Sequence, residues 1–354
     1  MTKSEPKKDA AISDLVTEIN SERRLVSFDS YDLSVRQLVD MFESDDIDIP
    51  PEYQRQFIWD EERQSQLIES VFLGIPVPSL FMATNIDATW EIVDGVQRLG
   101  TLAHFFGSAD LLKKIKREKP LKIVGLEKLE SLNDLTYDKL PKSIQLMFST
   151  RPIRVTVLND KSDLSVRFDL FERLNTGGIS LTNQEIRNCV FRGPYNDALK
   201  GLTANVDFAS VLRLKPGDQN NGTPEEFVLR FFAFFEQYTE FDHSVKGFLN
   251  DYMKKNASKT LPARSVTLFK DTFKLLNAAL PKGIVKGDRA ITPVNLYEGI
   301  AVGTALALKN NKNINAAKLK TLVNDPELRK FTIGGTNSRR MVVGRIEHVR
   351  DALV

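Results

Sequence analysis

Apolar residues recur with a helical period over much of this chain and with a strand-like pattern over a few short runs. Four of them share one helix face within residues 61–73, namely Leu67, Ile68, Val71 and Phe72. Asp60 precedes this run as a suitable N-cap, so we expect an amphipathic helix packed on a sheet. The runs that predict short strands lie at residues 24–28, 47–49, 79–84, 89–93 and 151–158.

The C-terminal half has the helical period almost throughout. Residues 227–238 carry aromatic side chains on all sides, which predicts a helix buried in the core of that half. Thr223, Pro224 and Glu226 precede it with the spacing of an N-cap, a first helical residue and the closing residue of a capping box. These patterns predict an α+β protein in which an α/β domain is followed by a mostly helical domain.

The domain bounds follow from the same patterns. We expect a flexible N-terminal arm at residues 1–24, an α/β domain at 25–190 with a helical insertion near 107–148, and a helical domain at 191–354.

Two short polar clusters interrupt the apolar pattern, each where one predicted element ends and the next begins. The first reads PEYQR at residues 51–55, and the second reads DGVQR at residues 94–98. The second follows a strand and opens a helix, whose start exposes backbone N–H groups that suit a phosphate. Gly95 allows close backbone approach, and Arg98 can donate two parallel hydrogen bonds. However, Asp94 and Gln97 are also spaced as a capping box, and Asp-Gly also suits a hairpin turn.

A third polar segment follows the helix predicted at residues 164–174. It contains Asn175, Thr176, Gly177 and Gly178. The two glycines either cap the helix C-terminus or present backbone N–H groups to an anion. Thr182 and Glu185 then form a capping box that opens the next helix.

Basic residues gather at two places. The more basic run holds Lys113, Lys114, Lys116 and Arg117, and a later turn before the last helix holds Arg339 and Arg340. Each is consistent with a solvated surface or with contacts to a DNA backbone.

Composition narrows the classes of function. The 354 residues carry 49 basic and 47 acidic side chains, so the net charge of +2 does not itself indicate a nucleic-acid or membrane partner. Cys189 is the only cysteine, which excludes an intramolecular disulfide and a multi-cysteine zinc site. There is no run of about 18 apolar residues and no apolar signal core, so we expect a cytoplasmic protein without a membrane partner. A Walker motif is absent, and the three histidines are far apart in the sequence.

The clusters resemble those of a known family. Together with LIES at 67–70 and GIPVP at 74–78, they are similar to the N-terminal domain of GmrSD-type restriction endonucleases, a large ParB/sulfiredoxin-like family. The resemblance continues in FERLNTGG at 171–178, QEIRN at 184–188, EFVLRFF at 226–232 and FLNDYM at 248–253. In one departure, Val96 stands where the family usually has a glutamine.

The resemblance implies a ParB/sulfiredoxin-like N-terminal domain that binds and hydrolyses a nucleoside triphosphate with Mg²⁺. It implies catalytic roles for Asp94, Gln97 and Arg98, with Asp94 also holding the metal ion. It implies nucleotide binding by Tyr53, Gln54, Arg55, Gly95, Arg98, Arg173, Asn175, Thr176, Gly177 and Arg187.

At the level of the system, the resemblance implies a sensor or regulatory subunit of a bacterial or phage defence system. DNA and a separate nuclease of the His-Asn-His type are its expected partners. Assembly into homo-oligomers is left open.

Two other hypotheses remain. Asp94, Glu52 and Glu69 could bind a metal ion, which would make the domain a nuclease in its own right. Alternatively, Val96 marks a lost activity, and the chain is a non-catalytic module that binds DNA or protein.

Overall fold

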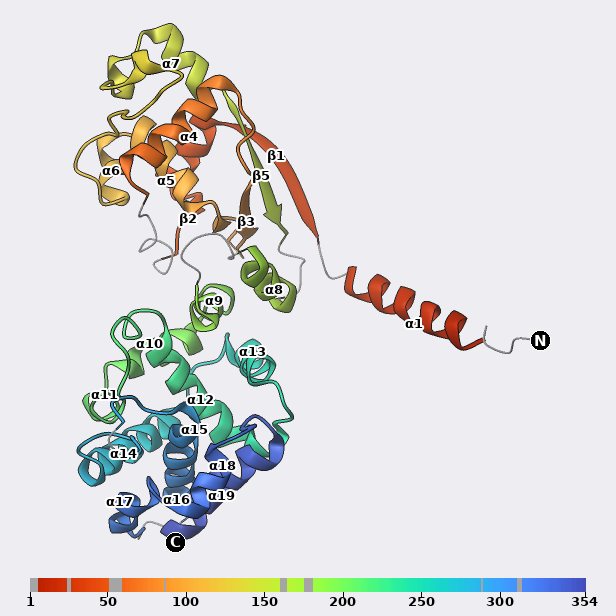
Figure 1. Cartoon of the computed structure of the whole chain (residues 1–354), viewed down its shortest axis with the longest axis vertical. Helices are drawn as coiled ribbons and strands as arrows, with labels where there is room; N and C mark the ends of the chain where they lie inside the picture. Colours follow the sequence, from red (N-terminus) through yellow and green to blue (C-terminus); the bar gives the residue numbers. More distant parts are fainter. Residues whose placement is uncertain are drawn as a thin grey trace. The chain divides into compact units, whose positions relative to one another are not determined.

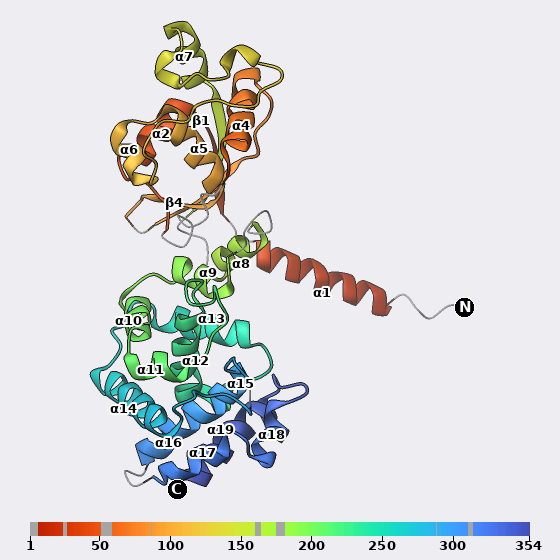
Figure 2. The same ribbon diagram turned by 60° about the vertical axis from the view of Figure 1, so that its left-hand side comes forward.

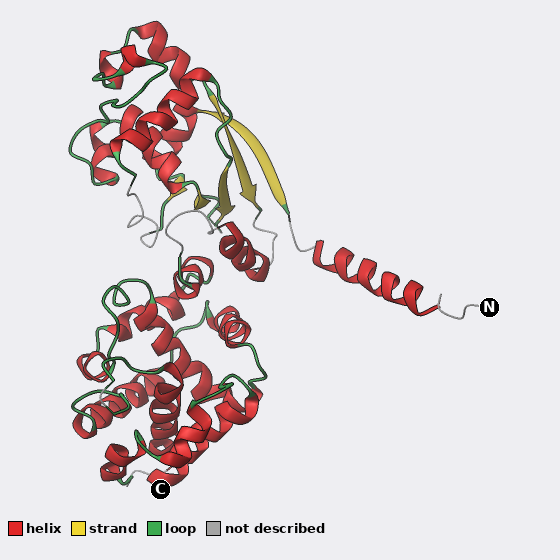
Figure 3. Cartoon of the chain, viewed as in Figure 1, coloured by secondary structure: helices red, strands yellow, loops and turns green. Residues whose placement is uncertain are grey.

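Two units with different secondary structure make up the chain, Met1–Ser180 and Leu181–Val354. The computed structural model describes residues 6–23, 27–50, 59–85, 87–159, 164–174, 181–287, 289–310 and 314–354. Within those ranges every strand lies in the first unit, and the second unit is helical (Figure 3). The predicted α+β class is therefore confirmed. No helix in the described part of the chain is long and apolar enough to span a membrane.

A five-stranded mixed sheet organises the first unit, with strand order β1-β5-β3-β4-β2. The strands are β1 (Phe28–Ser34), β2 (Ile47–Asp48), β3 (Leu80–Thr84), β4 (Trp90–Asp94) and β5 (Pro152–Leu158). β5 pairs with β3 in parallel and with β1 antiparallel, and β4 pairs with β3 antiparallel and with β2 in parallel. Four of the predicted runs thus form strands. The fifth was misplaced, because β1 occupies residues 28–34 and not 24–28; residues 24–26 lie outside the described ranges.

In the first unit, α1 (Pro6–Arg23) precedes the sheet in the sequence. The helices that follow β1 lie around the sheet (Figures 1 and 2). They are α2 (Val35–Glu43), α4 (Glu61–Leu73), α5 (Val96–Phe106), α6 (Ala109–Lys114), α7 (Lys142–Ser149) and α8 (Leu164–Leu174). α5 packs against both α2 and α4, whereas α8 packs against β4. The Asp60 cap of α4 is confirmed, since its Oδ1 accepts a hydrogen bond from the N–H of Arg63 at 2.8 Å. The segment between α5 and β5 contains α6 and α7.

The second unit is a helical assembly built around α12. Its helices are α9 (Asn183–Val190), α10 (Pro194–Thr203), α11 (Val206–Val211), α12 (Thr223–Gln237), α13 (Val245–Asn256), α14 (Ala263–Ala279), α15 (Val294–Tyr297), α16 (Gly303–Asn310), α17 (Leu319–Leu322), α18 (Pro326–Thr332) and α19 (Arg339–Leu353). A π-helical segment, Glu298–Val302, joins α15 to α16. The capping box predicted for α9 is present, with Thr182 and Glu185 bonded reciprocally.

The predicted burial of α12 is confirmed, but its predicted cap is wrong. Phe231, Phe232 and Phe234 are at most 1% exposed. The N-cap is Gly222 in the left-handed conformation, with φ 79°, and no described side chain caps the helix. Thr223 is already helical, and Glu226 bonds to Arg187 and Arg230 instead of closing a capping box.

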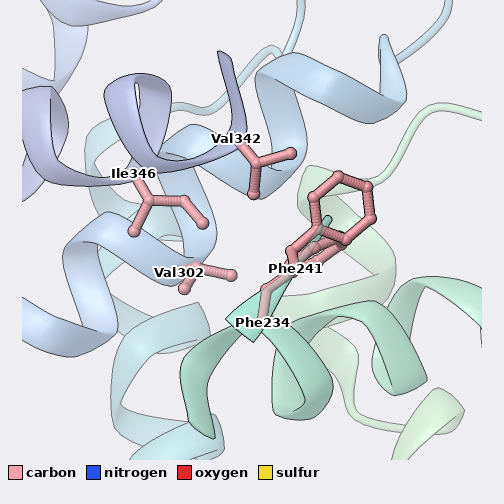
Figure 4. Close-up of a cluster of buried hydrophobic side chains, with 5 residues drawn as sticks. All are labelled: Phe234, Phe241, Val302, Val342 and Ile346. Carbon is pink, nitrogen blue, oxygen red and sulfur yellow. The ribbon is translucent and has the colours of Figure 1, made fainter. Parts of the chain in front are cut away.

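Part of this core is a cluster of five fully buried side chains from four segments of the second unit (Figure 4). They are Phe234, Phe241, Val302, Val342 and Ile346. The rings of Phe234 and Phe241 lie 5.6 Å apart, and Val342 and Ile346 bring α19 onto them. Contacts between residues this distant in sequence join the last helix of the chain to α12.

We expect Phe234→Ala to lower the free energy of unfolding of the second unit by about 3–5 kcal/mol, because it removes a buried ring and leaves a cavity. Denaturant unfolding followed by circular dichroism measures this change. Val206→Ala is the control: this side chain is 75% exposed, so its effect should stay within about 0.5 kcal/mol. Equal effects of the two substitutions would contradict the assignment of Phe234 to the core.

Candidate functional site

The second polar cluster forms the turn from β4 into α5. Gly95 is the N-cap of α5, with φ 104°, and among the described residues no side chain caps this helix. A Cβ atom on Gly95 would lie 2.3 Å from Cδ2 of Leu80, so neither the conformation nor the space admits another residue. The interpretations of Asp94 and Gln97 as a capping box and of Asp-Gly as a hairpin turn are therefore wrong.

Asp94 pairs with the arginine one helical turn later. Arg98 donates from Nη2 to Oδ2 of Asp94 at 2.5 Å and from Nη1 to the carbonyl oxygen of Pro78 at 2.7 Å. The side chain of Arg98 is 12% exposed, and that of Asp94 is 34% exposed. These two hydrogen bonds hold a cationic group beside the open helix start. Oδ1 of Asp94 accepts no hydrogen bond from the described residues and is available to water or a cation.

Gln97 links the helix start to Trp59, a described residue that follows the first cluster in the sequence. Its Oε1 accepts the backbone N–H of Trp59 at 3.1 Å. Before that cluster, Ile49 lines a small cavity together with Val96 of α5. Residues 49 and 59 are thus both placed beside α5. Tyr53, Gln54 and Arg55 themselves lie outside the described residues.

Val96, the departure from the family motif, is buried. It is 6% exposed and lines a cavity of about 50 Å³. The other lining residues are Phe42, Asp48, Ile49, Gly100, Lys114, Ile115 and Lys116. A glutamine at this position would place an amide in the wall of this cavity. Val96 lines this cavity, whereas Arg98 donates to the carbonyl oxygen of Pro78, so the two side chains lie in different surroundings.

Two buried residues that sequence reasoning missed support the same region. Gln64 donates from Nε2 to the carbonyl oxygen of Trp59 at 2.7 Å, and its Oε1 lies 2.8 Å from Nδ1 of His104. Nε2 of His104 lies 2.9 Å from the carbonyl oxygen of Lys119. Burial lowers the pKa of His104. The available signal was that Gln64 precedes Ile68 by one helical turn and so belongs to the buried face of α4.

The other residues with a predicted role in nucleotide binding are distributed over both units. Arg173 is exposed in the last turn of α8. Asn175, Thr176 and Gly177 lie outside the described residues. Arg187 is 1% exposed inside the second unit. It donates to Gln184, Glu226 and Asn250 over 2.8–3.1 Å. Their contact with a nucleotide stays a prediction.

Some side chains of the basic run after α5 make contacts within the first unit. Nζ of Lys114 bonds to Asp45 at 2.6 Å and lies 4.6 Å from the ring centroid of Phe42. Lys113 forms a solvent-exposed ion pair with Asp110 at 2.9 Å, and Lys116 lines the cavity beside Val96. Arg117 is half-buried, whereas Arg339 and Arg340 are exposed at the start of α19. Binding of DNA by these six residues stays a prediction.

The acidic residues suit a magnesium ion only if a ligand supplies most of its oxygens. In the described ranges no three His, Cys, Asp or Glu side chains come together as metal ligands. Glu69 accepts the N–H of Leu129 at 3.0 Å, and Glu52 lies outside those ranges. Mg²⁺ keeps several waters and is commonly held by one or two carboxylates plus phosphate oxygens. Asp94 with its free Oδ1 fits that role.

Comparison with protein families gives one match over this region. Residues 35–192 match the family described as GmrSD restriction endonuclease, N-terminal domain. Comparisons with curated proteins and with solved structures gave no match. The matched stretch begins with α2, contains both polar clusters and ends just after α9. It confirms the resemblance to this family for the motifs that lie within residues 35–192.

We expect Gly95→Ala to destabilise the first unit by at least about 1–3 kcal/mol, the usual cost of a non-glycine residue in this backbone region, with the clash against Leu80 added. Thermal and denaturant unfolding measure the effect. Gly201→Ala in α10 is the matched control, because no atom lies within 4 Å of the added Cβ. It should stabilise its helix by about 0.5–1 kcal/mol. If Gly95→Ala were as stable as wild type, the described turn would be wrong.

Proposed function

Residues 35–192 belong to the GmrSD restriction endonuclease N-terminal domain family, and we propose that the chain binds and hydrolyses a nucleoside triphosphate at the start of α5. The family makes the chain a component of a restriction or defence system. The single observation that carries the proposal is the junction at Gly95, where a helix start that no described side chain caps lies together with a fixed arginine and a half-exposed carboxylate.

Each part of this junction has a role in phosphate chemistry. The start of α5 offers backbone N–H groups and the positive end of an 11-residue helix to an anion. Arg98 adds a guanidinium that can donate to phosphate oxygens. It can do so while it stays bonded to Asp94 or after the phosphate replaces Asp94 as its acceptor. The glycine at position 95 lets the phosphate approach the backbone without meeting a side chain.

Hydrolysis requires a water molecule that attacks the terminal phosphorus while the bond to the leaving phosphate oxygen breaks. Charge then develops on the phosphate oxygens, where Arg98 stabilises it. Mg²⁺, held through Oδ1 of Asp94 and bound to the phosphates, would neutralise further charge. Gln97 holds Trp59 through its amide oxygen, and the family role of orienting water falls to Gln97 or to Gln54.

At the level of the system, we propose a cytoplasmic sensor or regulatory subunit. The nucleotide state would control recognition of DNA or a separate nuclease. The described residues bring no histidines together at a metal site, which is consistent with a nuclease residing in another chain.

We expect calorimetry with ATP, GTP, CTP and UTP plus Mg²⁺ to detect binding of at least one of them. Arg98→Ala should weaken that binding by about tenfold or more, because charge-assisted hydrogen bonds contribute roughly 1.5–3 kcal/mol. Arg154→Ala is the matched control. It removes a solvent-exposed arginine of the same unit, which pairs with Asp32 at 2.7 Å. It should leave nucleotide binding unchanged. A folded wild-type chain that binds none of the four nucleotides would refute the proposal.

We expect Asp94→Asn to separate nucleotide chemistry from metal-dependent DNA cleavage. The amide keeps an oxygen acceptor for Arg98 but loses the charge that attracts Mg²⁺. Nucleotide binding in the presence of a chelator should therefore persist, whereas the gain in affinity on adding Mg²⁺ and the phosphate release should fall at least about tenfold. Nicking of plasmid DNA that needs Mg²⁺ but no nucleotide, and that disappears in this variant, would favour a nuclease site instead.

A further inference from the structure

The second unit contains a pocket of about 340 Å³ whose lining residues all lie outside the matched stretch 35–192. Its lining comes from α12, α13, α15, the π-helical segment, the turn before α19, and α19 itself. The lining residues are Arg230, Val245, Val294, Asn295, Glu298, Thr336, Asn337 and Arg345. Val245 also packs against the cluster in Figure 4, so one wall of the pocket is continuous with the core.

A buried arginine in this pocket has an unused donor. Arg345 is 1% exposed. Its Nη1 donates to the carbonyl oxygen of Thr336 at 2.7 Å, and its Nη2 bonds to Glu298. Its Nε is buried and, among the described residues, has no hydrogen-bond partner. A buried guanidinium N–H without an acceptor is costly, so the site favours an incoming acceptor.

The charged groups around Arg345 form a linked set of ion pairs. Glu298 also accepts from Arg230 at 2.6 Å, and Arg230 in turn pairs with Glu226 at 2.7 Å. Glu226 pairs with Arg187 as well, at 3.1 Å. Burial alone would raise the pKa of Glu226, but Arg230 and Arg187 lower it overall and keep the carboxylate ionised. Each of the two glutamates is thus shared between two arginines.

The start of α19 directly follows two of the lining residues, Thr336 and Asn337. Its first turn contains Arg339 and Arg340 and no acidic residue, and no side chain of the described residues caps it. Cations at a helix N-terminus oppose the helix dipole. The helix start beside the pocket and the unused donor of Arg345 therefore both favour an anion.

We propose that this pocket binds the phosphate group of a small ligand. Arg345 and Arg230 would hold the phosphate oxygens, with the start of α19 and the amide of Asn337 at the rim. The concave shape and the apolar walls at Val245 and Val294 suit a compact ligand better than an extended DNA backbone. This pocket lies in the second unit, whereas the proposed nucleotide site at Gly95 lies in the first.

The test uses calorimetric titration with inorganic phosphate at constant ionic strength. It is done in the full chain carrying Arg98→Ala, so that the first-unit site does not contribute. Val294 is 39% exposed and lines the pocket, which makes it a position for adding charge without disturbing the core. Val294→Glu and Val294→Gln have nearly the same size and differ in charge. Circular dichroism confirms that each variant is folded.

We expect the Arg98→Ala chain to bind phosphate, Val294→Gln to bind within about threefold of it, and Val294→Glu to bind at least about tenfold more weakly. Asn337→Asp, at an exposed rim position, should weaken binding in the same direction. Equal binding by the two Val294 variants, or no phosphate binding by the Arg98→Ala chain, would overturn the proposal. A 20-base-pair DNA duplex is titrated in parallel. Weakening of DNA binding by Val294→Glu without any effect on phosphate would also overturn it, and would assign the surface to DNA.

Discussion

The passage from β4 into α5 at Gly95 is the constraint on which the first unit depends. β4 is bonded on both sides, to β3 and β2, so the direction in which it ends is fixed by the sheet. The chain must then turn into a helix next to Leu80, and a Cβ at position 95 would overlap the Leu80 side chain. The same tight turn leaves the start of α5 without a cap from any side chain in the described ranges. The geometry that completes the sheet and the geometry that offers N–H groups to an anion are therefore one feature.

Local sequence was enough to predict elements whose stabilising contacts are close in sequence. The caps at Asp60 and Thr182 are made within three residues, and both are present. Strands such as β3 and β5 are recognisable because buried apolar residues recur along them. β1 was misplaced because residues 28–34 are mostly polar, as suits an edge strand that is exposed for five of its seven residues.

The membership of the candidate site stays a prediction, and its contacts could not be predicted, because they join residues distant in sequence. The two caps read from spacing illustrate this. Asp94 has the spacing of an N-cap whose box Gln97 would close, but Arg98 takes its carboxylate. Glu226 has the spacing of a capping residue, yet it meets Arg187, 39 positions earlier, inside the second unit. In both cases an arginine competes with the backbone for the carboxylate, and a glycine in the left-handed conformation begins the helix instead. Sequence spacing carries no information about such an arginine.

The contacts of residues 96 and 97 also bear on the departure from the family motif. The amide oxygen of Gln97 accepts the backbone N–H of Trp59, so this residue holds Trp59 against α5. Position 96 instead faces a cavity that Ile49 and Lys116 also line. Replacing glutamine by valine there changes the polarity of a cavity wall and leaves the bond between Gln97 and Trp59 intact. It also leaves Arg98 bonded to Asp94 and Pro78. The substitution is therefore compatible with the proposed phosphate site. We expect it to change which ligand group the neighbouring cavity accepts.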